Sequence, residues 1–298
     1  METIAQANIR PRRSFLFVPG TGPQLFPKAL AAAPDIVCVD LEDAIAPDDK
    51  VSAREATMPL FAQYPNDGQV ERLVRINALN SADGLADLLA LLKCDTPPNG
   101  IMVPKVKSPD DIRLLDDLFT SEDSGLRLQV IIETNEALEA CFDIAQASPR
   151  IDALLFGGAD MSAELRVEPT WEALLYARSR LVHAAASAQI DLIDVPYLDL
   201  NDMPGLEIEA ALCAQLGMTG KGAIHPKQLE PISRHFTPNI EAITRARKIT
   251  STFEAAGAGL VGVEGRLETS VDEVSQIIQT NLIGSISCLK EAASRMST

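Results

Sequence analysis

The segment Asp35-Ile36-Val37-Cys38-Val39-Asp40-Leu41-Glu42-Asp43-Ala44 joins a β-branched apolar run to a cluster of carboxylates. A run of this kind is typical of a buried strand, so the acids fall where the strand ends. Two later apolar runs end in the same way, Ile131-Ile132-Glu133 and residues 154–160 (LLFGGAD). Three strands with acids at their carboxyl ends indicate one shared site at one end of a sheet or barrel. Clustered acids suit a metal ion or a general base.

Short apolar strands alternate with helical patterns along most of the chain. We expect strands at residues 14–18, 36–40, 73–77, 100–105, 128–133, 153–157, 192–195 and 222–225. We expect helices between them at residues 24–33, 50–63, 81–93, 109–119, 136–146, 172–188 and 206–216. This alternation predicts an α/β fold of the (β/α)8 TIM-barrel class. A doubly wound open sheet is the alternative, because the number of strands does not by itself establish closure.

The pattern changes after residue 225. Helices are expected at 226–236 and 239–256, followed by a hairpin-like segment at 257–265 and a last helix from about residue 271. These elements are too few for a separate core. We therefore predict a TIM-barrel catalytic domain over residues 1–237 and a C-terminal helical extension over 238–298 that caps the barrel or a neighbouring subunit.

Composition excludes several classes of function. The net charge of −16 disfavours nucleic-acid binding through a broad basic face. A phosphate-bearing ligand would need a local basic patch such as Arg10, Arg12 and Arg13, whose alternative is a solvated tail. Five cysteines without C-x-x-C spacing predict neither a disulfide framework nor a zinc site. Without a secretory signal or an apolar run of about 18 residues, we expect a soluble cytoplasmic protein and no membrane contact.

The predicted barrel gathers ionisable and polar side chains at its mouth, where catalytic residues of this fold lie. They are Glu42, Asp43, Arg75, Asn77, Lys105, Glu133, Asp160 and His225. Glu133 and Asp160 lie one strand–helix unit apart. Two neighbouring carboxylates repel unless a proton or cation lies between them, and hard oxygen ligands in small number suit Mg²⁺. The alternative is that Glu133 caps the following helix and Asp160 is a loop acid.

The remaining candidates each have a functional and a structural interpretation. Arg75 either clamps the carboxylate of a keto acid or forms a structural salt bridge to Glu42 or Asp43. Lys105 either forms a Schiff base or stays protonated among the acids, and the acids favour the ion pair. His225 is either a proton shuttle or a hydrogen-bonded structural residue.

Gly157 and Gly158 form the last pair of candidates. Glycine allows the backbone to approach a ligand closely, and the alternative is an ordinary loop.

Seven motifs occur in a fixed order: Arg13-Ser14-x-Leu16-Phe17-Val18-Pro19-Gly20, Asp40-Leu41-Glu42-Asp43-Ala44, Arg75-Ile76-Asn77, Pro104-Lys105, Ile132-Glu133-Thr134, Phe156-Gly157-Gly158-Ala159-Asp160 and Ala223-Ile224-His225-Pro226. Together they resemble the citrate lyase β-subunit-like branch of the malyl-CoA/citramalyl-CoA lyase (HpcH/HpaI aldolase) superfamily. The resemblance implies a TIM barrel that assembles as a trimer or hexamer, requires Mg²⁺, and cleaves or forms a C–C bond beside a thioester carried on CoA or an acyl carrier protein.

The resemblance also assigns roles to individual residues. Glu133 and Asp160 would bind the metal, and Arg75 would hold the oxygens of a keto acid. The amides of Gly157 and Gly158 would help to bind its carboxylate. Glu42 and Asp43 would orient the arginine and the metal-bound waters.

One part of the family pattern is altered. Malyl-CoA lyases usually take a catalytic aspartate from the tail of a neighbouring subunit, but the corresponding stretch here has Thr269 at that position. Glu264, Glu268 or another group would have to supply the acid.

The sequence therefore predicts a Mg²⁺-dependent lyase that cleaves citramalyl-CoA or malyl-CoA into acetyl-CoA and a 2-keto acid. One alternative is an aldolase for free keto-acid aldols. The other is a citrate lyase β subunit that acts only on a carrier-linked substrate. A basic patch at the mouth favours the CoA enzyme, and a closed apolar mouth favours the free aldolase.

Overall fold

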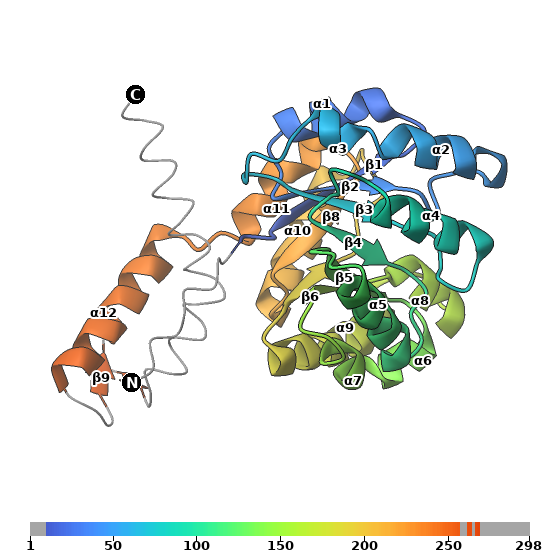
Figure 1. Cartoon of the computed structure of the whole chain (residues 1–298). Coiled ribbons are helices and arrows are strands. Elements are labelled where there is room, and N and C mark those ends of the chain that lie inside the picture. Colours follow the sequence, from blue (N-terminus) through green and yellow to red (C-terminus); the bar gives the residue numbers. More distant parts are fainter. Residues whose placement is uncertain (1–9, 257–260, 264–265, 269–298) are drawn as a thin grey trace, which may run out of the picture. The chain divides into compact units, whose positions relative to one another are not determined.

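Eight parallel strands close into a barrel in the computed structural model, which describes residues 10–256, 261–263 and 266–268 (Figure 1). They are β1 (Ser14–Pro19), β2 (Ile36–Asp40), β3 (Glu71–Arg75), β4 (Gly100–Val103), β5 (Arg127–Ile132), β6 (Ile151–Phe156), β7 (Asp191–Asp194) and β8 (Gly220–Ala223). The barrel closes where β8 pairs with β1, with Phe15 opposite Gly222. The (β/α)8 prediction is confirmed, and the open sheet is excluded.

The strands are buried on both faces, which explains why their sequences are continuous apolar runs. One buried cluster runs through the strands: Phe15, Ile36, Cys38, Leu73, Met102, Ile131, Ala153, Leu155 and Ile193. Because strand residues alternate between faces, residues two positions further along β2, β3 and β5 point to the same side at the carboxyl end. These residues are Asp40, Arg75 and Glu133.

Helices connect the strands and surround them (Figure 1). They are η1 (Pro23–Leu25), α1 (Phe26–Ala31), η2 (Pro47–Asp49), α2 (Lys50–Thr57), α3 (Leu60–Gln63), α4 (Ala82–Leu92), α5 (Pro109–Ser121), α6 (Asn135–Glu139), α7 (Cys141–Ala145), α8 (Gly158–Leu165), α9 (Trp171–Ala188) and α10 (Met203–Leu216). Side-chain oxygens of Ser81, Thr134, Thr170 and Asp202 accept backbone N–H groups at four helix starts. Helix α8 was not predicted, because its first residue belongs to the Gly157-Gly158 pair.

The arginines before β1 correct the prediction of a basic patch or solvated tail. Arg12 forms ion pairs with Glu71, Asp152 and Asp191 at 2.8, 3.1 and 3.0 Å. Arg13 pairs with Asp35 at 2.8 Å. Both guanidiniums therefore tie strands together at the amino ends of the barrel, the opposite end from the predicted site.

The chain divides into two compact units, of which one comprises Arg12–Ser233 and holds the barrel. After β8 follow η3 (Pro226–Gln228) and α11 (Leu229–His235). The other unit contains α12 (Ile240–Ala256) and an antiparallel pair, β9 (Val261–Val263) and β10 (Arg266–Glu268). The helix expected from residue 271 lies outside the described residues, and the boundary at residue 237 stays a prediction. No helix in the described part is long and apolar enough to cross a membrane.

Candidate active site

A cavity of about 90 Å³ lies at the carboxyl ends of the barrel strands. Its polar lining consists of Asp43, Arg75, Glu133 and Asp160, with Asp194 at the edge of β7. Its apolar lining consists of Phe17, Ile131, Leu155, Phe156, Val195 and Pro196, and Gly157 and Ala159 complete it. The structure thus brings most of the predicted site residues to one place, at the end of the fold where TIM-barrel active sites lie.

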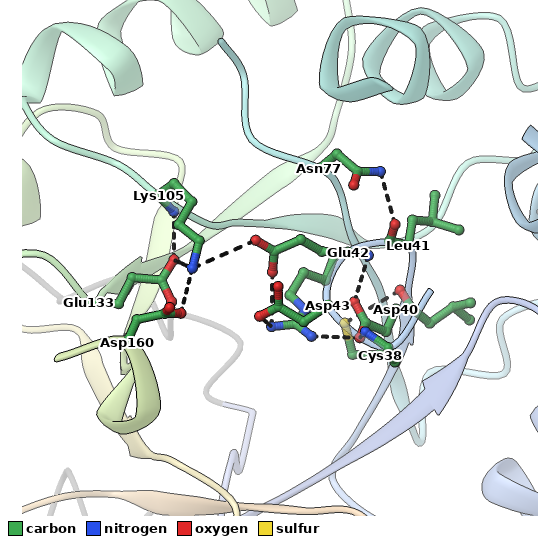
Figure 2. Close-up of polar contacts among 12 residues, drawn as sticks. Cys38, Asp40, Leu41, Glu42, Asp43, Asn77, Lys105, Glu133 and Asp160 are labelled. Carbon is green, nitrogen blue, oxygen red and sulfur yellow. Dashed lines mark hydrogen bonds and ion pairs between the residues drawn. The ribbon is translucent and has the colours of Figure 1, made fainter. Parts of the chain in front are cut away.

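Lys105 joins the two predicted metal ligands. Its backbone N–H donates to Oε1 of Glu133 at 2.7 Å, and its ammonium lies 3.5 Å from the same oxygen. The ammonium also donates to Oδ2 of Asp160 and lies 3.9 Å from Oε1 of Glu42. Figure 2 shows the ammonium between Glu42 on one side and the Glu133–Asp160 pair on the other.

The backbone of Lys105 has a positive φ of 54°. Residues other than glycine rarely adopt this conformation, and some of those that do lie at functional sites. Here it lets one residue direct both its N–H and its ammonium at Glu133. The predicted ion-pair role of Lys105 agrees with these contacts.

The two acids differ in their protonation. Burial, a hydrogen bond with Asp160 and nearby acids raise the pKa of Glu133 to about 8 against the pull of Lys105. Partial burial acts to raise the pKa of Asp160, but hydrogen bonds from Lys105 and Glu133 outweigh it and hold this pKa below its ordinary value. Burial lowers the pKa of Lys105, but Asp160, Glu133 and Glu42 outweigh it and raise this pKa, so the ammonium stays charged.

Arg75 is held by Asp40, a member of the acid cluster to which the sequence analysis assigned no role. Its Nε and Nη2 donate to Oδ1 and Oδ2 of Asp40 at 2.6 and 2.5 Å. Its third nitrogen, Nη1, lies 3.0 Å from Glu42 and 3.7 Å from Asp43. The guanidinium lies 5.3 Å from the centre of the Phe17 ring. Arg75 therefore forms structural salt bridges and also lines the cavity.

Glu42 and Asp43 occupy different environments. Glu42 is buried between Arg75 and Lys105, and burial raises its pKa to about 7 although Arg75 opposes the shift. Asp43 lines the cavity, and 60% of its side chain is exposed. Only Asp43 of this pair is in a position to meet a ligand in the cavity.

The glycine pair passes close beside the acids. A methyl group on Gly157 would lie 2.3 Å from Cβ of Glu133, so no larger residue fits without moving that glutamate. The N–H of Gly157 donates to the carbonyl of Ile132 at 3.0 Å, which removes it from the predicted carboxylate-binding role. Gly158 begins α8, and Asp160 lies in its first turn, where backbone N–H groups and the helix dipole favour negative charge.

Two predicted mouth residues have structural roles. Asn77 is buried and donates to Asp87 and to the carbonyl of Leu41. His225 accepts the N–H of Lys227 through Nδ1 at the start of η3 and does not line the cavity. The capping alternative for Glu133 is wrong, because Thr134 caps α6 and leaves the Glu133 carboxylate at the cavity.

The Glu133–Asp160 pair fits Mg²⁺ and does not fit zinc. In the described part of the chain, no group of three or more His, Cys, Asp or Glu side chains is arranged to hold a metal. Zinc needs three or four nitrogen or sulfur ligands, whereas Mg²⁺ commonly takes one or two carboxylates with waters and substrate. The pair already attracts one cation, the ammonium of Lys105.

Comparisons with known proteins identify a family and several relatives to which this chain is similar. A family model described as HpcH/HpaI aldolase/citrate lyase matches residues 13–226. An L-malyl-CoA/beta-methylmalyl-CoA lyase of Cereibacter sphaeroides is 34% identical over 287 residues, covering 87% of this chain and 90% of the relative. The citrate lyase subunit beta of Escherichia coli is 31% identical over 277 residues, covering 89% and 91%.

Two solved structures are also similar. The protein CitE of Mycobacterium tuberculosis, in complex with magnesium, acetoacetate and coenzyme A, has a TM-score of 0.75 at 26% identity, covering 91% of this chain and 99% of that one. RipC of Yersinia pestis has a TM-score of 0.68 at 36% identity, covering 78% and 97%.

Proposed function

The chain belongs to the HpcH/HpaI aldolase/citrate lyase family, and we propose that it is a Mg²⁺-dependent carbon–carbon lyase that cleaves a 3-hydroxyacyl-CoA into acetyl-CoA and a 2-keto acid. Family membership confirms the resemblance found in the sequence. The observation that carries the proposal is the convergence of Arg75, Glu133 and Asp160 on one cavity in a chain whose relatives are lyases.

Glu133 and Asp160 would hold the magnesium. Magnesium in the CitE structures supports this assignment at the level of the family. When bound, Mg²⁺ supplies a Lewis acid that favours loss of a hydroxyl proton and polarises the carbonyl that replaces the hydroxyl. The chain contributes two carboxylates, one of which, Glu133, is packed closely against the backbone of Gly157.

Arg75 and the start of α8 would bind the keto-acid part of the substrate. Asp40 binds two nitrogens of Arg75 and so fixes the plane of the guanidinium. The third nitrogen, Nη1, then faces Glu42, Asp43 and the cavity. The first-turn N–H groups from Gly158 onward replace the Gly157 amide as donors to the substrate carboxylate. Glu42 acts through its contacts with Arg75 and Lys105 and is a positioning residue.

The reaction needs two proton movements. The 3-hydroxyl loses its proton, the bond between C2 and C3 of the acyl chain breaks, and its electron pair becomes the enolate of the acetyl thioester. A proton must then reach the enolate carbon to give acetyl-CoA. Glu268 lies on β10 in the second unit, and Glu264 lies outside the described residues, so the donor stays a prediction.

The lining favours a keto acid with one carboxylate. Among the described lining residues Arg75 is the only base, and Asp43, Glu133, Asp160 and Asp194 are acids. Oxaloacetate from citryl-CoA would bring a second carboxylate into this acidic cavity, where the lining carboxylates would repel it. Glyoxylate and pyruvate bring only one, and the apolar wall of Ile131, Leu155 and Val195 accommodates a methyl group. We therefore favour malyl-CoA and citramalyl-CoA over citryl-CoA.

The proposed assembly rests on the family resemblance, and the proposed location rests on the sequence, in which no secretory signal was found. We propose a homotrimer or hexamer in the cytoplasm, with acyl-CoA as its small-molecule partner. Coenzyme A in the CitE structure supports the CoA part of this proposal.

A substrate panel tests the proposed function. Purified protein with Mg²⁺ is given citramalyl-CoA, malyl-CoA and citryl-CoA, and separately free keto-acid aldols, while acetyl-CoA and keto acids are measured. We expect cleavage of the first two thioesters. Turnover of free aldols alone would support the aldolase, and turnover only of a carrier-linked substrate would support the citrate lyase β subunit.

A further inference from the structure

A group of buried and partly buried charges lies beside the cavity, and one of its members, Asp194, forms part of the cavity lining. None of them takes part in the chemistry proposed above. Lys221 on β8 is fully buried and donates to Asp194 at 2.6 Å and to Glu209 at 2.6 Å. Asp194 on β7 also accepts from Arg178 of α9 at 2.9 Å. Burial acts to raise the pKa of Asp194, but Lys221 and Arg178 outweigh it and hold this pKa below its ordinary value. We name Arg178, Asp194, Glu209 and Lys221 the buried ion cluster.

The third hydrogen bond of Lys221 reaches the wall of the cavity. Its ammonium donates to the backbone carbonyl of Val195 at 2.7 Å, directly after β7. Val195 lines the cavity. A methyl group on Gly158 would lie 3.1 Å from Cγ1 of Val195, so this side chain packs against the first residue of α8. Asp160 follows two residues later in the same helix.

Arg178 reaches the same place by a second route. Its guanidinium lies 4.9 Å from the centre of the Phe156 ring, which is the last residue of β6. Phe156 also lies beside Gly158, at 3.2 Å from the position of a methyl group there. The buried ion cluster therefore contacts the start of α8 through Val195 on one side and Phe156 on the other.

Resting on the proposed function, we propose that Lys221 is a positioning residue for the metal site: by fixing the Val195 carbonyl it holds Val195 against the start of α8 and so keeps Asp160 in place opposite Glu133. A short helix at the mouth of a barrel is free to shift unless both sides of its start are packed. Residues that orient metal ligands without touching the metal commonly change metal affinity when they are replaced.

Binding of Mn²⁺ alone tests this role without relying on catalysis. The dissociation constant is measured by electron paramagnetic resonance for the full chain and four variants, together with thermal unfolding. Lys221→Met removes the contact with Val195, and Val195→Ala removes the packing on α8. Glu209→Gln disturbs the charge around Lys221 but leaves the Val195 contact. Leu198→Ala changes an exposed residue of the same loop.

We expect Lys221→Met to weaken Mn²⁺ binding about tenfold and Val195→Ala to weaken it by a smaller factor, with Glu209→Gln and Leu198→Ala unchanged. Lys221→Met will also unfold at a lower temperature, because it leaves buried acids with fewer cations. If Lys221→Met fails to fold, the Mn²⁺ affinity of Val195→Ala provides the test of the positioning role.

Wild-type affinity in folded Lys221→Met, or in Val195→Ala, would overturn the inference. Loss of affinity in Glu209→Gln equal to that in Lys221→Met would assign the effect to general destabilisation and would also overturn it. Failure of the unchanged protein to bind Mn²⁺ would refute the metal site of the proposed function itself, and is thereby distinguishable from failure of the positioning role.

Discussion

Arg75 and Asp40 face each other across the β2–β3 pairing, with two parallel hydrogen bonds of 2.6 and 2.5 Å joining guanidinium and carboxylate. They are register partners in adjacent parallel strands and both are largely buried. A bidentate pair fixes the plane of the guanidinium as well as its position. Asp40 therefore determines which face of Arg75 is presented to the cavity.

Arg75→Lys is expected to lower kcat/KM about a hundredfold, because a single ammonium cannot pair with Asp40 and serve a ligand at once. Asp40→Asn is expected to cause a smaller loss, since it removes the partner that holds Arg75 in place. Neither variant should change Mg²⁺ affinity, measured by isothermal titration calorimetry. Arg113→Lys, at an exposed arginine paired with Asp110, is the matched control. Wild-type kcat/KM in Arg75→Lys would show that Arg75 is purely structural.

Glu133→Gln and Asp160→Asn are expected to abolish Mg²⁺-dependent cleavage while the fold is retained. Each substitution removes a charged oxygen ligand but keeps the shape of the side chain. Glu133→Gln should unfold no earlier than the wild type in EDTA, because burial already favours a neutral group at this position. Glu136→Gln, at an exposed acid paired with Lys107, is the control. Normal turnover in either variant would refute the metal assignment.

Stability without metal should fall as pH rises. The pKa of Glu133 is about 8 in the folded chain against an ordinary value of 4.5, so the folded state keeps a proton that the unfolded state releases between these values. Folding is then favoured at the low end of this window and less favoured toward its upper end. Glu42, with a pKa of about 7, acts in the same direction. Thermal unfolding in EDTA from pH 5 to about 8.5 measures the slope, as linkage requires.

Magnesium binding should strengthen over the same pH window, because the metal needs the ionised form of Glu133. Glu133→Gln should reduce the decrease of folding stability with pH and leave the part that is due to Glu42. A melting temperature that stays level or rises with pH in the wild type would contradict the raised pKa of Glu133.

Gly157→Ala is expected to disrupt the metal site more than the fold. The added methyl group would lie 2.3 Å from Cβ of Glu133, so the glutamate or the start of α8 must move. We expect Mg²⁺ affinity to fall about tenfold, as for other changes that displace a ligand. Gly125→Ala, where nothing lies within 4 Å of the added group, is the control. Equal affinities in the two variants would show that the backbone at Gly157 does not constrain Glu133.

Much of the fold could be predicted because the barrel strands are continuous apolar runs, buried on both faces. Every predicted strand overlaps an observed one, although β3 and β8 each begin and end two residues earlier than expected. Helix α8 was missed because Gly157 and Gly158 are poor helix formers, while the observed helix begins on the second of them. That error placed Asp160 in a loop, whereas it lies in the first turn of a helix.

The sequence indicated residues that line the cavity, but it did not indicate the buried residues that hold them in place. Asp40 lies within a strand, and only the register of β2 against β3 reveals it as the partner of Arg75. Pairing the two predicted strands residue by residue would have placed Asp40 opposite Asn77, because the observed β3 lies two residues earlier than the predicted strand. Lys221 and Asp194 lie in two short consecutive strands, and nothing in their local sequence indicates a shared buried contact.

The most direct test of the account is release of acetyl-CoA and keto acid from citramalyl-CoA and malyl-CoA, with Mg²⁺ and again with EDTA. We predict stoichiometric release of acetyl-CoA and pyruvate or glyoxylate with Mg²⁺, abolished by EDTA and restored by added Mg²⁺. Failure of folded protein to cleave either thioester, or equal cleavage in EDTA, would contradict a magnesium-dependent lyase.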